Sequence, residues 1–191
     1  MHIGLYFGSF NPVHVGHLII ASYARHTTDL KQVWLVVSPQ NPLKPSKTLL
    51  NEYHRLHLAN VAIEDDAFLK TTDIEFHLPR PSYTIDTLTY LKEKYPQHTF
   101  SIIMGSDCLQ NISQWKNFEK LLQQHILYVF KRPGFEIETT KYPDANIRVV
   151  HAPLLEISST QIRKLIKERI PVRYMVTDAV NSEIEANGYY R

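Results

Sequence analysis

Short apolar segments of strand length alternate with segments of helical length along almost the whole chain. Strands that are apolar at nearly every position occur mainly in parallel sheets, where helical connections cover both faces. We therefore expect an α/β fold of the Rossmann-like, doubly wound type, with a mainly parallel sheet and helices on both faces. The expected strands are residues 2–7, 32–37, 68–76, 99–104, 126–130 and 147–150. Helices are expected over residues 18–24 and 82–95. Three more are expected: one that Asn51 caps, one through Leu121 and Leu122, and one after Ser158.

Length and composition favour one globular domain. The chain has 191 residues, of which 43% are hydrophobic and 21% charged, enough to form a single substantial core. We expect one domain over residues 1–191, with a small helical part from about residue 158. A net charge of +2 gives no indication of nucleic acid or an anionic membrane as a partner. Cys108 is the sole cysteine and no apolar run reaches the ~18 residues of a membrane helix, so we expect a cytoplasmic protein.

The ten residues from Gly8 to His17 occupy the turn between the first expected strand and the first expected helix. A helix that starts here leaves its first N–H groups unpaired, and together with the helix dipole these groups attract phosphate. Gly8 allows a ligand to approach the backbone closely. His14 and His17 are three residues apart, so they share one face of the first turn and can both donate hydrogen bonds, with added charge if a ring is protonated. This turn predicts a site for a nucleotide phosphate.

Other interpretations of this turn fit less well. Two histidines at this spacing could bind zinc, but the metalloprotease pattern H-E-x-x-H is not met, because Val15 and Gly16 lie between them. The chain also lacks the G-x-x-x-x-G-K-[ST] pattern of P-loops and has no G-x-G-x-x-G after a strand. We therefore expect no protein-bound metal at these histidines.

The turn after the last expected strand carries a second signal, from Ile157 to Arg163. Ser158 and Gln161 have the spacing of a capping box, and a plain helix cap is the simplest interpretation. Three hydroxyl residues in a row exceed what a cap requires, and Arg163 could add an anion-binding fork. Two helix N-termini of this kind at one edge of a sheet indicate a polyphosphate ligand such as a nucleoside triphosphate.

These two segments resemble the signatures H-x-G-H and I-S-S-T-x-I-R of the nucleotidyltransferase superfamily. The resemblance is most specific to the bacterial nicotinate mononucleotide adenylyltransferase family, and it covers nearly the whole chain. Further matches are S-Y-T-I-D-T-L at residues 82–88, G-S-D at 105–107 with Trp115, R-P-G at 132–134, and the ending at residues 172–190.

The resemblance implies that ATP and nicotinate mononucleotide react to give nicotinate adenine dinucleotide (deamido-NAD) and pyrophosphate. The phosphate of the mononucleotide would attack the α-phosphorus in line, without a general base. His14, His17 and Arg163 would be the catalytic residues that stabilise charge, and Mg²⁺ would be held mainly by the ATP phosphates. ATP, the mononucleotide and further copies of the chain in a homo-oligomer are the expected partners.

The resemblance also assigns binding residues. Those for ATP are Gly8, Ser9, Phe10, His17, Gly105, Asp107, Ile157, Ser158, Thr160 and Arg163, and those for the mononucleotide are Lys44, Tyr83, Thr84, Asp107 and Trp115. Structural alternatives are open for several of them: Trp115 as a core residue, Asp107 as a helix cap, Tyr83 and Thr84 as a helix entry, and Lys44 as a solvated loop residue.

The chain departs from the family pattern at a few positions. Asn11 stands where the family more often has Asp, Phe7 where it usually has Gly, and Pro79-Arg80 where glycines often precede P-S-Y-T. Three alternative functions are open to such a chain. They are phosphopantetheine adenylyltransferase, a family that usually has Thr at the position of His14, transfer to the amide form of the mononucleotide, and a non-catalytic nucleotide-binding module.

Overall fold

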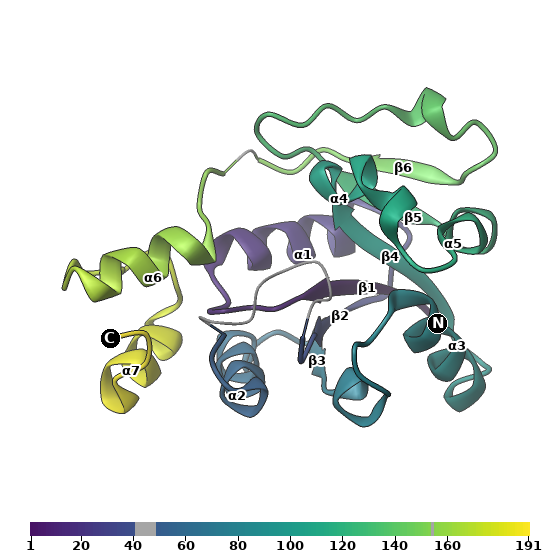
Figure 1. The fold of residues 1–191 in the computed structure, drawn as a ribbon. Coiled ribbons are helices and arrows are strands. Elements are labelled where there is room, and N and C mark those ends of the chain that lie inside the picture. Colours follow the sequence, from purple (N-terminus) through teal and green to yellow (C-terminus); the bar gives the residue numbers. More distant parts are fainter. Residues whose placement is uncertain (41–48, 154) are drawn as a thin grey trace.

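The computed structural model contains one parallel sheet whose strand order runs β3-β2-β1-β4-β5-β6 (Figure 1). The structure describes residues 1–40, 49–153 and 155–191. Every neighbouring pair of strands is parallel, which confirms the expected doubly wound α/β fold. The strands are β1 (His2–Gly8), β2 (Gln32–Val37), β3 (Leu69–Thr72), β4 (Thr99–Gly105), β5 (Leu127–Phe130) and β6 (Ile147–Val150).

Helices cover both faces of this sheet. On one face, α1 (Val15–Thr27) and α2 (Glu52–Ala62) bury side chains such as Ala21 and Leu58. On the other face, α3 (Thr84–Lys94), α4 (Ser106–Gln110) and α5 (Phe118–Gln124) bury side chains such as Leu88 and Leu121. Asn51 caps α2 as expected, because its side chain accepts a hydrogen bond from the N–H of Tyr53. Three short 3-10 helices lie between these elements: η1 (Ile74–His77), η2 (Ile112–Gln114) and η3 (Thr139–Lys141).

The direction of the connections reverses between the neighbouring strands β1 and β4. The helix after β1 packs on one face of the sheet and the helix after β4 packs on the other. The two loops therefore diverge at the carboxyl ends of these strands and leave a crevice, where ligands of open α/β sheets bind.

The expected strand over residues 68–76 is wrong in its second half. The strand β3 ends at Thr72, and η1 follows. The carbonyl of Asp73 accepts a hydrogen bond from the N–H of Phe76 at 2.7 Å, which closes the turn. Glu75 turns into the protein, is 2% exposed, and accepts hydrogen bonds from Ser82 and Thr87. These two partners come from the following segment, so they are not visible in the local pattern of strand residues.

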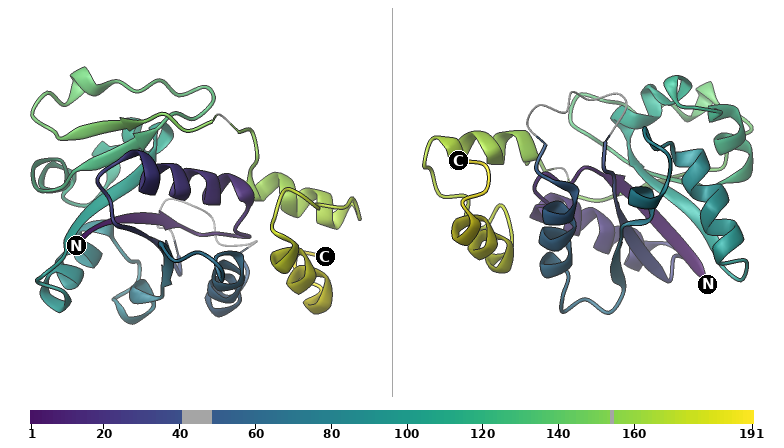
Figure 2. Two further views of the ribbon diagram at one scale, coloured as in Figure 1. Left: turned by 180° about the vertical axis from the view of Figure 1, so that it is seen from behind. Right: turned by 60° about the horizontal axis from the view of Figure 1, so that its bottom comes forward.

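The last two helices lie beyond the carboxyl end of the sheet (Figures 1 and 2). Helix α6 (Ser159–Lys167) lies next to the start of α1, and α7 (Asp178–Asn187) lies beside α2. The Tyr189 hydroxyl lies 2.8 Å from Nδ1 of His54 in α2, which links the end of the chain to that helix. The division into one domain with a helical part from about residue 158 stays a prediction.

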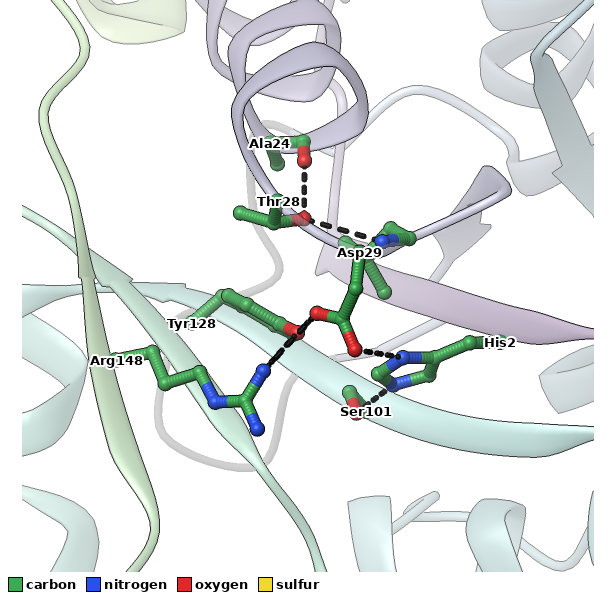
Figure 3. A network of polar contacts seen from close by, with 8 residues as sticks. His2, Ala24, Thr28, Asp29, Ser101, Tyr128 and Arg148 are labelled. Atoms are coloured by element: carbon green, nitrogen blue, oxygen red, sulfur yellow. Dashed lines mark hydrogen bonds and ion pairs between the residues drawn. The ribbon is translucent and has the colours of Figure 1, made fainter.

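The opposite, amino-terminal ends of the strands are joined by a polar network (Figure 3). Asp29 contacts His2 at 3.0 Å and Arg148 at 3.0 Å, and it accepts a hydrogen bond from the Tyr128 hydroxyl. His2 in turn contacts Ser101 Oγ at 2.6 Å. The order Asp29–His2–Ser101 is similar to a hydrolase triad, but Ser101 is completely buried, so no substrate reaches its hydroxyl. The network therefore ties four strands together.

No helix in the described residues is long and apolar enough to cross a membrane.

Candidate active site

The loop from β1 to α1 places two histidine rings against each other at the carboxyl end of the sheet. His14 is the N-cap of α1, with an extended backbone, and His17 is in its first turn. The backbone N–H of His14 donates to Nδ1 of His17 at 3.2 Å, so Nε2 of His17 carries the hydrogen when the ring is neutral and can donate to a ligand. The two rings stack with their centroids 3.6 Å apart. The structure thus brings together the two histidines singled out by the sequence.

Gly16 provides the space that the His14 ring occupies. A Cβ atom at this position would lie 3.1 Å from both Cε1 and Nδ1 of His14, which is closer than a normal van der Waals contact. The glycine of the H-x-G-H pattern is therefore explained in this chain by the position of the His14 ring, which a side chain at residue 16 would displace.

His14 is suited to donate a hydrogen bond rather than to carry charge. It is 4% exposed, and burial, followed by the nearby Arg132, lowers its pKa to about 4. The ring is therefore neutral at pH 7, so the condition for added charge, protonation of the ring, is not met at His14. Its Nδ1 atom is buried and has no hydrogen-bond partner among the described residues.

Phe10, in the loop between β1 and α1, adopts an unusual backbone conformation. Its φ is 43°, in the left-handed region that bulky residues rarely adopt. Its ring is 2% exposed and packs edge-on against Tyr6 and His17, at centroid distances of 5.8 and 5.0 Å. A Cβ at Gly8 would lie 2.9 Å from this ring. Of the predicted ATP contacts in this loop, Phe10 can therefore offer only its backbone.

The segment from Ile157 to Arg163 is hydrogen-bonded directly to the loop between β1 and α1. The Ser159 hydroxyl donates to the carbonyl of Pro12 at 2.9 Å, and Nη1 of Arg163 donates to the carbonyl of Asn11 at 2.7 Å. The other end of the Arg163 guanidinium lies 3.3 Å from Oγ1 of Thr160. The cap is confirmed as well, because the Ser158 hydroxyl accepts a hydrogen bond from the N–H of Gln161.

Asn11 keeps a hydrogen bond that an aspartate could also make. Its Oδ1 atom accepts from the N–H of Leu50 at 3.2 Å, and the residue is 5% exposed. Because both side chains carry an acceptor oxygen at this position, the departure from the family pattern preserves this loop-to-loop bond.

A hollow opens beside the two histidines. Arg132, the first residue of the R-P-G segment, is part of its wall, and no role for this residue was predicted from the sequence. Ser106 positions the Arg132 segment, since its hydroxyl accepts from the N–H of Arg132 at 2.9 Å and donates to the carbonyl of Phe135 at 2.8 Å. The residues that line the hollow are Tyr6, His14, Gly16, His17, Ile20, Phe130, Lys131, Arg132, Pro133, Pro153, Leu155 and Ile157.

Asp107 lies in the first turn of α4, at the end of β4, and pairs with this arginine. Its Oδ1 lies 3.5 Å from Nε of Arg132, and both side chains are partly exposed. A Cβ at Gly105 would lie 2.3 Å from the same Oδ1, so a larger residue here would displace this carboxylate from its present position. The G-S-D segment thus holds a carboxylate and a cation next to the histidines.

The predicted pyridine-binding residues gather at the start of α3 on the other face of the sheet. Tyr83 is the N-cap of this helix and Thr84 its first residue. Nζ of Lys116 lies 4.8 Å from the centroid of the Tyr83 ring and 2.8 Å from the Asp86 carboxylate, so the Trp115–Lys116 segment lies close to the start of α3. Trp115 and Tyr83 are both partly buried against the core of this face. Lys44 lies outside the described residues.

The chain is similar to known proteins in both sequence and fold. The sequence profile of the family described as "Cytidylyltransferase-like" matches residues 5–165. Proteins of Cytophaga hutchinsonii and Flavobacterium psychrophilum, both named "Probable nicotinate-nucleotide adenylyltransferase", are 50% and 47% identical. The first match covers 100% of this chain and 98% of the relative, and the second covers 100% of both. The fold is similar to that of the Plasmodium falciparum nicotinic acid mononucleotide adenylyltransferase complexed with NaAD, with a TM-score of 0.84, 22% identity, and coverage of 99% of this chain and 97% of the other.

Proposed function

Because the chain belongs to the cytidylyltransferase-like family, with nicotinate-nucleotide adenylyltransferases among its relatives, we propose that it transfers the adenylyl group of ATP to nicotinate mononucleotide. The products are nicotinate adenine dinucleotide and pyrophosphate, and the reaction belongs to NAD biosynthesis. The protein is thus an enzyme, a nucleotidyltransferase.

One observation carries the assignment of roles. Two donor rings, His14 and His17, and a helix N-terminus with Thr160 and Arg163 are fixed to the same short loop at the crevice. Binding alone would not require this set of donors around one position. A triphosphate that lies across both helix N-termini would meet the two histidine donors on one side and a guanidinium on the other.

The chemistry needs positioning and charge stabilisation more than acid–base catalysis. An oxygen of the mononucleotide phosphate forms a new bond to the α-phosphorus, and the bond from that phosphorus to the bridging oxygen of pyrophosphate breaks. The attacking phosphate is already anionic at pH 7, so no general base has to remove a proton. His14 and His17 donate hydrogen bonds to the oxygens that gain charge, while Thr160 and Arg163 hold the leaving pyrophosphate.

Arg132 is added to this set by its position. Its guanidinium lines the hollow beside His14, and its charge helps to keep that ring neutral. We assign it to the phosphates as well, while its partner Asp107 is assigned to nucleotide hydroxyls. Backbone groups of Gly8, Ser9, Phe10 and Gly105 would complete the ATP site.

The mononucleotide is assigned to the other side of the crevice. The Trp115 ring would stack on the pyridine ring, and Tyr83 and Thr84 would line its pocket, with N–H groups at the start of α3 near the carboxylate of nicotinate. The half-buried position of Trp115 leaves part of its ring able to contact a ligand.

Mg²⁺ is proposed to enter as part of the substrate, bound to ATP. Among the described residues no three His, Cys, Asp or Glu side chains are grouped to hold a metal ion, and the carboxylate of Asp107 is paired with Arg132. The residues present thus fit a cation whose ligands are mostly phosphate oxygens and water.

Pyrophosphate release tests the function. The folded protein is supplied with ATP and Mg²⁺ and, in parallel, with nicotinate mononucleotide, nicotinamide mononucleotide or phosphopantetheine. A clear preference for the first acceptor is expected. Preference for the second would make the enzyme an amide-specific relative, preference for phosphopantetheine would make it a phosphopantetheine adenylyltransferase, and no release with any acceptor would favour a nucleotide-binding module.

We further propose a cytoplasmic location and a single nucleotidyltransferase domain in which the helical part from about residue 158 completes the ATP site. Cell fractionation tests the location. Limited proteolysis tests the domain, since one protected core that includes α6 is expected.

A further inference from the structure

Arg55 in α2 is the largest side chain that is completely buried in the described part of the chain. Within residues 1–40, 49–153 and 155–191, its guanidinium donates four hydrogen bonds, and each of these goes to a backbone carbonyl. These are Leu50 at 2.8 Å, Ser9 at 2.5 Å, Ser38 at 2.8 Å and Pro39 at 3.0 Å. Arg55 therefore joins the loop after β1, the end of β2 and the start of α2 in the interior of the protein.

The bond to Ser9 bears on the site, because it holds the peptide plane that precedes Phe10. The carbonyl of Ser9 and the N–H of Phe10 belong to one rigid plane, and rotation of that plane changes the φ of Phe10. This φ is 43°, which a phenylalanine keeps only where its surroundings enforce it. At 2.5 Å, the bond from Nη1 of Arg55 is the shortest of the four.

The backbone of Phe10 in turn decides where its ring lies. The ring is 2% exposed and meets the His17 ring edge-on, with 5.0 Å between the centroids and 76° between the planes. A change in φ at Phe10 would swing the ring away from this position. The contacts thus run in sequence from Arg55 to the Ser9 carbonyl, to Phe10, and to His17.

We propose that Arg55 is a positioning residue that sets the place of His17 through the Ser9–Phe10 peptide and the Phe10 ring. Only the catalytic part of this inference, the role of His17, rests on the function proposed above. The geometric part concerns the position of a ring and can be measured without substrate.

The donor geometry explains why arginine is needed here. A guanidinium spreads its N–H groups over a planar fork, whereas an ammonium group directs three donors from one point. Lysine at this position could not reach acceptors that lie along three separate segments. Burial lowers the pKa of Arg55 to about 10, so the group is still charged at pH 7 and its hydrogen bonds are charge-assisted.

The experiment compares Arg55→Lys with the unaltered protein by NMR and by steady-state kinetics. The Cε1–H signal of His17, identified by its loss in His17→Ala, is expected to be shifted in the unaltered protein by the ring currents of the stacked His14 ring and the edge-on Phe10 ring. In Arg55→Lys it should move toward the position of an unfolded histidine. We expect kcat to fall about tenfold to a hundredfold, with both KM values changed less than about threefold.

Two further variants separate positioning from loss of stability. Ser101→Ala removes a buried hydrogen bond at the opposite end of the strands and should lower the melting temperature without changing kcat or the His17 signal. Phe10→Leu should lower kcat by itself, and addition of Arg55→Lys to it should cause little further loss, because both changes interrupt the same path.

The inference is overturned if Arg55→Lys leaves the His17 signal in place, or if its effect on kcat multiplies with that of Phe10→Leu. Arg55→Gln, which buries no charge and keeps two N–H donors, replaces the lysine variant if that one does not fold. If the protein shows no transferase activity but the signal moves as expected, the proposed function has failed and the positioning has not.

Discussion

Replacement of Gly16 by alanine tests how tightly the His14 ring is held. The new Cβ would lie 3.1 Å from two atoms of that ring, whereas non-bonded carbon atoms settle at about 3.5–4.0 Å. Ordinary contacts of a Cβ atom begin at 3.4 Å, so the ring would have to retreat by a few tenths of an ångström. The His17 ring stacks on His14, so a displacement of one ring disturbs the other.

A displacement of this size should be felt in catalysis more than in stability. Catalytic groups tolerate about 0.5 Å of error, and misplacement by about 1 Å costs up to a hundredfold, so we expect kcat to fall severalfold and at most about tenfold. Alanine stabilises a helix by about 1 kcal/mol relative to glycine, while overpacking costs about 1–3 kcal/mol. The net loss should not exceed about 2 kcal/mol, or a decrease of at most ~8 °C in the melting temperature for a chain of this size.

The same substitution in a His14→Ala background provides the matched control. Without the ring, the nearest remaining contact of the new Cβ is the Cβ of Ile157 at 4.0 Å, an ordinary distance. Gly16→Ala should then stabilise the protein by up to about 1 kcal/mol and leave the residual kcat unchanged. The measurements are steady-state kinetics and thermal melting of the four proteins. Equal losses of kcat in both backgrounds would refute the steric explanation.

The remaining predictions concern the same crevice. His17→Ala should lower kcat about a hundredfold in a folded protein, as for removal of a donor to developing charge, and full activity would remove His17 from the mechanism. Trp115→Ala should chiefly raise KM for the mononucleotide, whereas an unchanged KM would leave Trp115 as a packing residue. Burial and then Arg132 lower the pKa of His14 to about 4, so between pH 6.5 and 4 the unfolded chain binds a proton that the folded protein does not, and stability falls as the pH falls. Between pH 7 and pH 5 the free energy of unfolding should fall by about 2 kcal/mol more in the unaltered protein than in His14→Gln. Urea titration at the two pH values measures both losses, and equal losses would contradict the lowered pKa.

The sheet could be predicted from the sequence because strands that are buried on both faces consist of consecutive apolar residues. Segments such as residues 32–37 and 99–104 are apolar or nearly so at consecutive positions, and the structure places them in β2 and β4. The strand expected over residues 68–76 failed where the local pattern depends on distant partners. Glu75 is buried because Ser82 and Thr87 hold its carboxylate, and nothing within the segment itself indicates this.

The candidate site was predictable where its residues are contiguous. His14 and His17, or Ser158 and Arg163, lie within one helical turn or two, so their spacing reveals a shared face. Arg55 and Arg132 could not be singled out in this way. Arg55 is one arginine in an amphipathic helix, where a solvated side chain is the usual expectation, and its burial follows from carbonyl groups of three other segments.

The bonds from Ser159 to Pro12 and from Arg163 to Asn11 have a consequence for the protein during its synthesis. Asn11 and Arg163 are 152 positions apart, and a ribosome that adds about 5–20 residues per second needs ~8–30 s to cover that distance. For this time the histidine loop has emerged without the helix that holds it. A nascent chain can therefore pair its first strands early, yet it cannot acquire a complete triphosphate site until α6 has left the exit tunnel, and fragments that end before α6 should be catalytically silent.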